Sequence, residues 1–355
     1  MTLDDLIAAV KTAHAEATPL RLRGAGSKDF YGTLLAGEVL DVSAYRGIIA
    51  YEPTELYITV KGGTPLSEIE AALAEKGQML AFEPPGFGTS TAGGCVAAGL
   101  SGPRRQQAGA VRDFVLGVKL IDGTGQVLDF GGQVMKNVAG YDVSRLLAGS
   151  MGTLGLLAEV SLKVLPRPVA EATIVFEMNE SEAIVRLNRW GGQPLPVSAS
   201  FWSDGRLFLR LSGARAAVDA ARRKLGGELA VAGKNLWKSV REQTPAAFVG
   251  PLLWRLAVPS FPTPGCLAWR LAQEKYSAPY CLLHWRISCR PVPPLFPNPG
   301  RRRPGCRAVC SCWPVACNHR SPRISMRRVP VCWPGSGSSC LKKPRPDAVV
   351  QCVFT

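Results

Sequence analysis

Glycine is concentrated in the first part of the chain, where 24 of the 37 glycines lie before residue 166. Helices and strands both disfavour glycine, so this density indicates many turns with positive φ, or a backbone that closely approaches a ligand. Short β-rich runs alternate with helical runs over the same stretch, and residues 114–132 form two alternating runs around a turn at residues 122–125. These patterns predict a mixed α+β fold that is rich in loops.

The amino-acid composition changes near residue 260. Residues 1–260 carry 27 basic and 25 acidic side chains, a net charge of +2, whereas the last 95 residues carry 15 and 2, a net charge of +13. Ten of the eleven cysteines and 15 of the 28 prolines also lie in those last 95 residues. The high pI of about 9.6 therefore belongs to the tail, and we expect no nucleic-acid partner for the body of the protein.

The pattern of residues 1–260 changes again at Pro166 and Pro168. We expect a glycine-rich binding domain over residues 1–165 and, over residues 166–260, a small sheet with two packed helices that acts as a covering domain. Asp4 and Asp5 stand where a signal peptide needs positive charge, and the most apolar later stretch is too interrupted to span a bilayer. Together with a single cysteine in 260 residues, these features predict a cytoplasmic protein.

Residues 261–355 allow several interpretations. Four cysteines lie within residues 306–317, but their spacing matches neither a ferredoxin run nor a paired zinc site, so we expect no metal. A disulfide framework, nucleic-acid binding through arginines 301–303 and a solvated basic tail are alternatives. A frameshift near residues 260–265 explains more, because the tail lacks any sustained pattern and has the Pro, Arg, Cys, Trp and Ser content of a GC-rich gene read in the wrong frame. On that hypothesis the covering domain is incomplete and the tail is disordered.

Three loops of the first domain carry the candidate binding residues. The first directly follows a predicted strand and contains Arg23, Gly24, Ala25, Gly26, Ser27 and Lys28. Successive N–H groups in such a turn form a concave site for an anion, and the serine and the lysine add a hydroxyl and a cation. The loop lacks the GxGxxG pattern of a dinucleotide fold and the GxxxxGK(S/T) pattern of a phosphate-binding loop, so an ordinary glycine turn is the alternative.

The second loop spans residues 84–102, where nearly every side chain from residue 88 onward is small. Such a backbone can lie against a flat, extended ligand, and tight packing of two loops is the alternative. The third region, residues 136–155, has glycine-rich segments on both sides of a short predicted helix, for which a structural helix with glycine caps is the alternative. The candidate residues of these two regions are Pro84, Thr89, Ser90, Thr91, Gly93, Gly94, Gly99, Gly102, Gly140, Tyr141, Asp142, Gly152, Thr153, Leu154 and Gly155.

Together the loops resemble the PCMH-type flavin-binding domain of the vanillyl-alcohol-oxidase family, which includes bacterial D-lactate and glycolate dehydrogenases. The resemblance covers about residues 17–165, and its most specific part is KNVAGYD followed by GSMGTLG. It implies a PCMH-type FAD-binding domain of two subdomains, with FAD as the cofactor. In this family the RGAGSK-like turn holds the FAD pyrophosphate, the small-residue segment lies along the cofactor and the GTLG turn closes over it. Arg112 and Asp113 stand at the positions of a further pair near the flavin.

Residues 166–260, and within them the sequence WRLAVPS at 254–260, are similar to the small flavin-binding subunits of bacterial glycolate oxidases. This resemblance implies an FAD-dependent oxidoreductase subunit that oxidises glycolate to glyoxylate and passes electrons to the respiratory chain. It also implies two partners, a larger flavoprotein subunit and an iron–sulfur subunit, and a peripheral position at the inner membrane through them.

Histidine is missing from most of the chain. Some members of the family bind flavin covalently through histidine, but none lies between His14 and His284 here, so we expect non-covalent FAD. Relatives with complete catalytic domains often supply clustered histidines for the oxidation of 2-hydroxy acids. We assign no catalytic residue in this chain and expect that it needs its partners. The alternatives are a self-sufficient FAD-dependent 2-hydroxy-acid (D-lactate-like) dehydrogenase and a non-catalytic flavin- or nucleotide-binding assembly subunit.

Overall fold

The computed structural model describes residues 1–31, 37–132 and 141–248, together with four later strands. The elements up to residue 166 are α1 (Leu3–Ala15), β1 (Leu20–Arg23), β2 (Glu38–Asp41), β3 (Ile48–Glu52), β4 (Tyr57–Lys61), α2 (Leu66–Glu75), β5 (Gln78–Met79), α3 (Ala92–Ala98), α4 (Arg105–Ala108), the 3-10 helix η1 (Val111–Asp113), β6 (Val115–Ile121), β7 (Val127–Gly131), α5 (Val143–Leu146), β8 (Leu156–Lys163) and β9 (Leu165–Pro166). The later elements are β10 (Ala170–Glu177), α6 (Glu180–Gly191), β11 (Val197–Ser203), β12 (Arg206–Gly213), α7 (Arg215–Leu225), β13 (Glu228–Leu229), α8 (Gly233–Arg241), the 3-10 helix η2 (Ala246–Phe248), β14 (Leu252–Val258), β15 (Cys281–His284), β16 (Trp313–Ala316) and β17 (Ala348–Phe354).

The first unit is built on a sheet with the strand order β3-β4-β8-β6-β7, in which each neighbouring pair is antiparallel. Helices α2 and α3 pack on this sheet, and Ile69, Leu73 and Val96 are buried with the strand residues in one core. Strands β6 and β7 form the hairpin expected from the sequence. At its turn, a carboxylate oxygen of Asp122 accepts a hydrogen bond from the N–H of Thr124 at 2.8 Å.

A separate parallel pair, β1 and β2, packs with α1 in a small apolar cluster. Helix α1 begins at a capping box in which Thr2 and Asp5 exchange hydrogen bonds. Leu6 and Val10 of this helix are buried in a cluster that also includes Leu22 of β1 and residues of β6 and β8. This packing fixes the end of β1, and with it the first predicted loop, against the large sheet.

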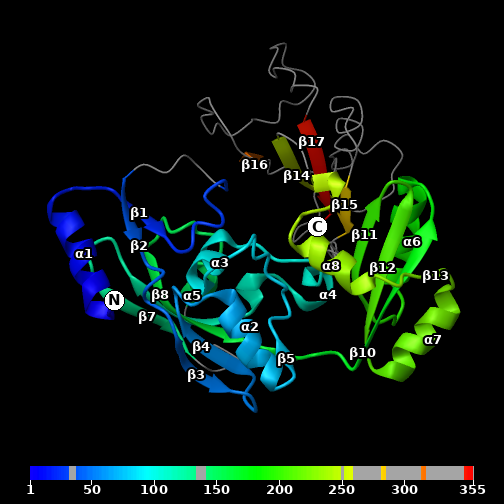
Figure 1. Cartoon of the computed structure of the whole chain (residues 1–355), viewed down its shortest axis with the longest axis horizontal. Coiled ribbons are helices and arrows are strands. Elements are labelled where there is room, and N and C mark those ends of the chain that lie inside the picture. Colours follow the sequence, from blue (N-terminus) through cyan, green and yellow to red (C-terminus); the bar gives the residue numbers. More distant parts are fainter. Residues whose placement is uncertain are drawn as a thin grey trace, which may run out of the picture.

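The second unit contains a sheet with the strand order β13-β10-β12-β11-β15-β17-β14-β16. The alternating side chains of β12 separate its two faces: Leu207, Leu209 and Leu211 pack with α6 and α7, whereas Phe208 and Arg210 lie on the side of α8. In Figure 1, α4 and α8 lie between this sheet and the blue and cyan elements of the first unit. The mixed α+β fold expected from the sequence is confirmed.

Strands β15, β16 and β17 come from the last 95 residues and extend the second sheet beyond β11. The rest of residues 261–355, and with it most of the predicted disordered tail, lies outside the described residues. No helix in the described part of the chain is long and apolar enough to cross a membrane.

Buried charges join the two units. Glu83, between β5 and α3, accepts hydrogen bonds from the backbone N–H of Arg104 at 2.8 Å and from Nη2 of Arg210 on β12 at 2.9 Å. Glu171 on β10 accepts a hydrogen bond from Nη2 of Arg104 at 2.9 Å. The side chains of Arg104 and Arg210 are 5% and 3% exposed, so each guanidinium depends on its carboxylate partners.

The pKa of Glu83 reflects this arrangement. Burial by itself raises the pKa of the carboxyl, but the charges and hydrogen bonds of Arg210 and Arg104 outweigh burial and hold the pKa below its usual value. A carboxyl whose pKa is depressed in the folded state adds stability above the unfolded-state pKa of about 4.3. That contribution is lost as the pH falls through the folded-state pKa.

We predict that Glu83→Gln lowers the free energy of unfolding at about pH 7 by about 3 kcal/mol, because two buried guanidinium groups lose their shared anion. In urea titrations the difference from the wild type should stay constant down to about pH 5 and shrink below about pH 4. The control Glu182→Gln removes an exposed pair with Arg186 and should change the free energy by less than about 0.5 kcal/mol. Equal effects of the two substitutions would contradict the role given to Glu83.

Candidate functional site

The first predicted loop has a row of free backbone N–H groups. In the described residues, none of the N–H groups of residues 24–28 donates to an acceptor within the protein. Arg23 ends β1, and its Nε donates to Asp29 at 3.0 Å. Gly26 has a φ of +72°, and a Cβ there would overlap the guanidinium of Arg23. The turn therefore holds its charged side chains beside it and leaves its N–H groups available to an anion.

The second predicted loop lies directly against the first. A Cβ at Gly24 would overlap the side chain of Thr91, so a glycine is needed for this close approach. Nζ of Lys28 donates to Oγ of Ser90, which lies 62 positions further along the chain. The same ammonium lies 5.7 Å from the ring centroid of Phe87. The structure thus brings together two loops that the sequence analysis could only consider separately.

Lys28 is a partly buried cation between these loops. Burial lowers the pKa of its ammonium below the usual value, while Cys95 and Glu242 act in the opposite direction. Such a group gains more than a fully hydrated lysine from an anionic ligand. Burial also raises the pKa of the Cys95 thiol to about 11, so this thiol stays protonated at neutral pH.

Backbone N–H groups of the second loop are also free. In the part of the chain that the structure describes, the N–H groups of residues 88–91 have no protein acceptor. Thr89 is exposed, whereas Ser90 and Thr91 are buried. Oγ1 of Thr91 caps α3 by accepting the N–H of Gly94 at 3.3 Å. The two buried hydroxyls therefore bind Lys28 and the helix, and the backbone between them remains free.

Other small residues of the second loop serve packing. The N–H of Gly93 donates to the carbonyl of Gly62 at 2.8 Å, and a Cβ at Gly93 would lie 3.1 Å from the same oxygen. A Cβ at Gly102 would overlap the carbonyl of Glu83. Pro84 is buried in the same segment. Tight packing of loops, the alternative from the sequence, is sufficient to explain Gly93 and Gly102.

The third region contacts the end of α3. The N–H groups of Gly149 and Met151 donate to the carbonyl oxygens of Val96 and Ala97 at 3.0 and 2.9 Å. Gly99 ends α3 with a φ of +67°, and a Cβ there would lie 2.8 Å from Cα of Gly149. The second and third loops therefore meet through their backbones.

Residues 152–155 return the chain to β1. A Cβ at Gly152 would lie 3.3 Å from Cδ1 of Leu22 in that strand. Gly155 has a φ of +138°, and a Cβ there would collide with a carbonyl of β6. Thr153 and Leu154, between these glycines, are exposed. All three predicted loops therefore converge around α3 and the end of β1.

The remaining predicted residues lie at the periphery. Tyr141 is 96% exposed. Asp142 caps α5, accepting the N–H of Arg145 at 3.2 Å and pairing with its Nε at 3.0 Å. Gly140 lies outside the described residues.

Arg112 and Asp113 belong to η1 and form an exposed ion pair at 3.8 Å. Asp113 also accepts the N–H of Ala110 at 2.8 Å. Its carboxylate therefore has a local structural role, and Arg112 is the member of the pair that reaches the cavity described next.

A cavity of about 270 Å³ opens where the second and third loops meet. Gly99 and Arg112 are the predicted residues that line it. Its further lining residues are Tyr31, Ala98, Arg105, Ala110, Val111, Ala148, Gly149 and Met151. Oγ of Ser150, between two lining residues, is buried and has no partner in the described structure. The cavity is thus lined by both polar and apolar residues. The guanidinium of Arg112 lies at its edge, and the unpartnered hydroxyl of Ser150 lies nearby.

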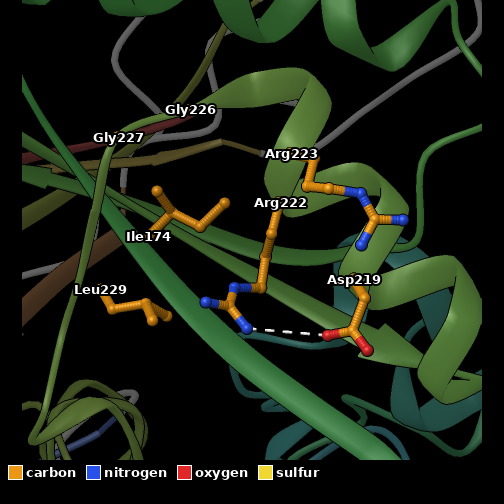
Figure 2. Close-up of a pocket in the computed structure, with 7 residues that line it drawn as sticks. All are labelled: Ile174, Asp219, Arg222, Arg223, Gly226, Gly227 and Leu229. Atoms are coloured by element: carbon orange, nitrogen blue, oxygen red, sulfur yellow. Dashed lines mark ion pairs between the residues drawn. The ribbon is translucent and has the colours of Figure 1, made fainter.

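A second hollow, of about 350 Å³, lies on the covering unit beside α7 (Figure 2). Its lining includes Ile174, Arg222, Arg223 and Leu229, and Arg222 pairs with Asp219 at 3.6 Å. None of the predicted loop residues lines this hollow. Among the described residues, no cluster of three or more His, Cys, Asp or Glu side chains is arranged to hold a metal ion.

Several residues of this region were not predicted from the sequence. Tyr31 and Arg105 line the cavity, and the charge of Arg105, three residues after the small-residue segment ends at Gly102, was a signal that could have identified it. Glu242 contacts the second loop at Gly86, 156 positions away. Nothing in the local sequence around Glu242 indicates such a contact.

Comparison with known proteins defines the class. Residues 1–131 match the family model described as FAD binding domain. The chain is 51% identical over 257 residues to glycolate oxidase subunit GlcE of Escherichia coli (strain K12), covering 72% of this chain and 73% of that protein. It is 32% identical over 159 residues to glycolate oxidase subunit GlcD of Bacillus subtilis (strain 168), covering 44% and 34%. It is 28% identical over 181 residues to a D-lactate dehydrogenase of Anaerostipes hadrus, covering 50% and 38%.

Solved structures share the fold. Alkyldihydroxyacetonephosphate synthase matches with a TM-score of 0.56 and 16% identity, over 77% of this chain and 63% of that one. The glucose dehydrogenase Phl p 4.0202 matches with a TM-score of 0.55 and 17% identity, over 76% and 60%. The protein is thus a flavoprotein with a PCMH-type FAD-binding domain, of a class of FAD-linked oxidoreductases. Within this class the chain belongs to the family of glycolate oxidase subunit GlcE, and the resemblance drawn from its loops is confirmed.

The loops fit the phosphate-bearing part of FAD. Residues 24–28 and 88–91 present free N–H groups within the described structure, and Lys28 adds a partly buried positive charge. The cavity, beside which the unpartnered hydroxyl of Ser150 is buried, provides further room for flat parts of a ligand. The donor set consists of hydrogen-bond donors and a cation, as a pyrophosphate requires.

We predict that Gly99→Ala lowers the free energy of unfolding by about 2–4 kcal/mol, because a methyl group adds left-handed strain and collides with backbone. The matched control is Gly77→Ala, which follows α2 with a similar φ of +65° but has nothing within 4 Å of its Cβ position. That control should lose only about 1 kcal/mol. Denaturant titrations compare the two, and equal losses would show that the contact with Gly149 is unimportant.

Proposed function

We propose that the chain is the FAD-binding subunit of a glycolate dehydrogenase complex. In this complex glycolate loses a hydride and a proton to become glyoxylate, and the electrons pass on to the respiratory chain. The partners are a larger flavoprotein subunit and an iron–sulfur subunit. The proposal includes a cytoplasmic location, with attachment to the inner membrane through those partners.

The observation that carries the proposal is the 51% identity to glycolate oxidase subunit GlcE over 257 residues. The similarity to D-lactate dehydrogenases is 28% and covers about half of this chain. Both kinds of relative are named for 2-hydroxy acids, which agrees with glycolate as the substrate. The higher identity over the greater length favours the subunit over a self-sufficient enzyme.

The residues proposed to hold FAD are those of the three loops. The free N–H groups of residues 24–28 and 88–91 donate to the pyrophosphate, and Lys28 opposes its charge. Residues 99–102 and 149–155, with Arg112, surround the flatter parts. When bound, FAD supplies a two-electron acceptor for the hydride. The chain's own contribution is to bind, orient and shield this group.

We propose that FAD is bound without a covalent link. The chain has no histidine between His14 and His284, and His14 is exposed on α1. Cys95 is buried, and its raised pKa of about 11 keeps the thiol protonated. Neither side chain is suited to attack the flavin.

We predict that the purified chain binds FAD, shows a flavin band in the visible spectrum and releases all flavin on acid precipitation. Lys28→Met should raise the Kd for FAD at least about tenfold, because the phosphates lose a partly buried counter-charge. The control Lys11→Met changes an exposed residue of α1 and should leave the Kd unchanged. Fluorescence titration of the apoprotein measures both values.

Measurements of turnover distinguish the proposed subunit from the two alternative functions. Glycolate should reduce an artificial acceptor when the chain is co-purified with its two partner subunits, and the isolated chain should show no turnover. Turnover by the isolated chain would favour the self-sufficient dehydrogenase. A wild-type chain that takes up no flavin would favour the non-redox assembly subunit and refute the proposal.

The last 95 residues of the chain differ in composition from the rest. The same 257 residues make up 72% of this chain and 73% of the GlcE relative, so the two chains have nearly equal lengths while about a quarter of each remains unmatched. The last 95 residues of this chain hold ten of its eleven cysteines and two of its 27 acidic residues. We infer that a shifted reading frame near residues 260–265 replaced the native end of the covering domain.

Sequencing of the locus from independent clones tests this inference. We predict a single insertion or deletion near codon 260, and correction of the frame should restore a tail with ordinary acidic content. An uninterrupted frame in every clone would contradict the inference.

A further inference from the structure

A carboxylate of the covering unit is bound by the backbone of the second loop. Glu242, which follows α8, accepts the N–H of Gly86 at 3.0 Å and the N–H of Phe87 at 2.7 Å on the same oxygen, Oε2. Its Oε1 accepts the N–H of Gly86 at 3.2 Å. Hydrogen bonds from N–H groups to an ionised acceptor are among the stronger ones in proteins.

Glu242 is itself held in place by a cation. Nε of Arg241 donates to its Oε1 at 3.0 Å. Nη1 of the same arginine pairs with Glu70 of α2 at 2.9 Å. The end of α8 therefore has two separate contacts with the first unit, one to backbone N–H groups and one to a side chain.

The backbone bound by Glu242 is strained. Phe87 has a φ of +47° and Gly88 a φ of +90°, and the left-handed region is costly for a residue with a side chain. The ring of Phe87 packs edge-on against Phe30 at 5.4 Å and lies near Lys28. The hydrogen bonds that the N–H groups of Gly86 and Phe87 donate to Glu242 offset the cost of this conformation.

Phe87 leads directly into the free part of the loop. Among the described residues, the N–H groups of residues 88–91 follow without a protein acceptor and lie beside the first loop through Gly24 and Lys28. The charge of Glu242 also acts to raise the pKa of Lys28 against the effect of burial. A change at Glu242 therefore removes both the acceptor that holds the loop and one of the charges that raise the pKa of Lys28.

We propose that Glu242 is a positioning residue for the cofactor, which fixes Gly86 and Phe87 so that the following N–H groups face the pyrophosphate. The inference rests on the proposed function, because it assumes FAD at these loops. It makes the covering unit part of the cofactor site, although Glu242 is not required to touch FAD.

The test compares Glu242→Gln with Glu70→Gln in the full chain. Glu242→Gln removes the charge and one acceptor from the N–H groups, whereas Glu70→Gln breaks the ion pair of Arg241 and leaves the N–H groups bound. Fluorescence titration with FAD should give a Kd raised about tenfold or more for Glu242→Gln and less than about twofold for Glu70→Gln. Without FAD, amide hydrogen exchange at Gly86 and Phe87 should accelerate in Glu242→Gln alone.

The outcomes separate the possible roles. Equal losses of affinity in both variants would mean that Glu242 merely docks α8, and would overturn the inference. Unchanged or tighter binding in Glu242→Gln would also overturn it, tighter binding meaning that the carboxylate competes with FAD for the N–H groups. These results leave the proposed function intact, whereas a wild-type chain that binds no FAD overturns the proposed function and this inference together.

Discussion

The candidate site depends on the close approach of glycine backbone to the neighbouring loops around α3. Gly24 lies where a Cβ would overlap Thr91, and Gly99 lies where a Cβ would meet Cα of Gly149. These contacts leave no room for a side chain at either glycine, so the polar groups presented to a ligand are mainly main-chain N–H groups. A hydrogen-bonded helix or strand would have used those groups internally. The irregular, glycine-rich backbone is therefore the physical condition for the site.

The segment that links β5 to α3 connects this site to the covering unit. Its start, Glu83, is bound by Arg210 of β12, and its middle, at Gly86, is bound by Glu242 after α8. Buried or partly buried charges mediate both contacts, and each is costly to leave unpaired. The conformation of the second loop is thus determined by residues from both units. A first unit without its covering unit would lack these constraints.

Local patterns in the sequence were sufficient to predict the strand and turn of residues 20–28 and the hairpin around Asp122, because each is formed by neighbouring residues. The pattern of small residues could not separate two roles of glycine. Gly93 packs on Gly62, whereas Gly24 allows two loops to approach each other, and the local sequence does not differ in a way that marks either role. Contacts such as Glu83 with Arg210, 127 positions apart, have no local pattern. The strand order that brings such distant residues together is set by the whole folded chain and not by neighbouring residues.

The charged side chains around the loops are already paired within the described structure: Arg23 with Asp29, and Arg145 with Asp142. The groups left for a ligand are mainly N–H donors and the ammonium of Lys28. Donors bind anions and stabilise negative charge, but they accept no proton. Oxidation of an alcohol needs an acceptor for its hydroxyl proton. We therefore propose that these loops serve cofactor binding and that a partner subunit supplies the proton acceptor.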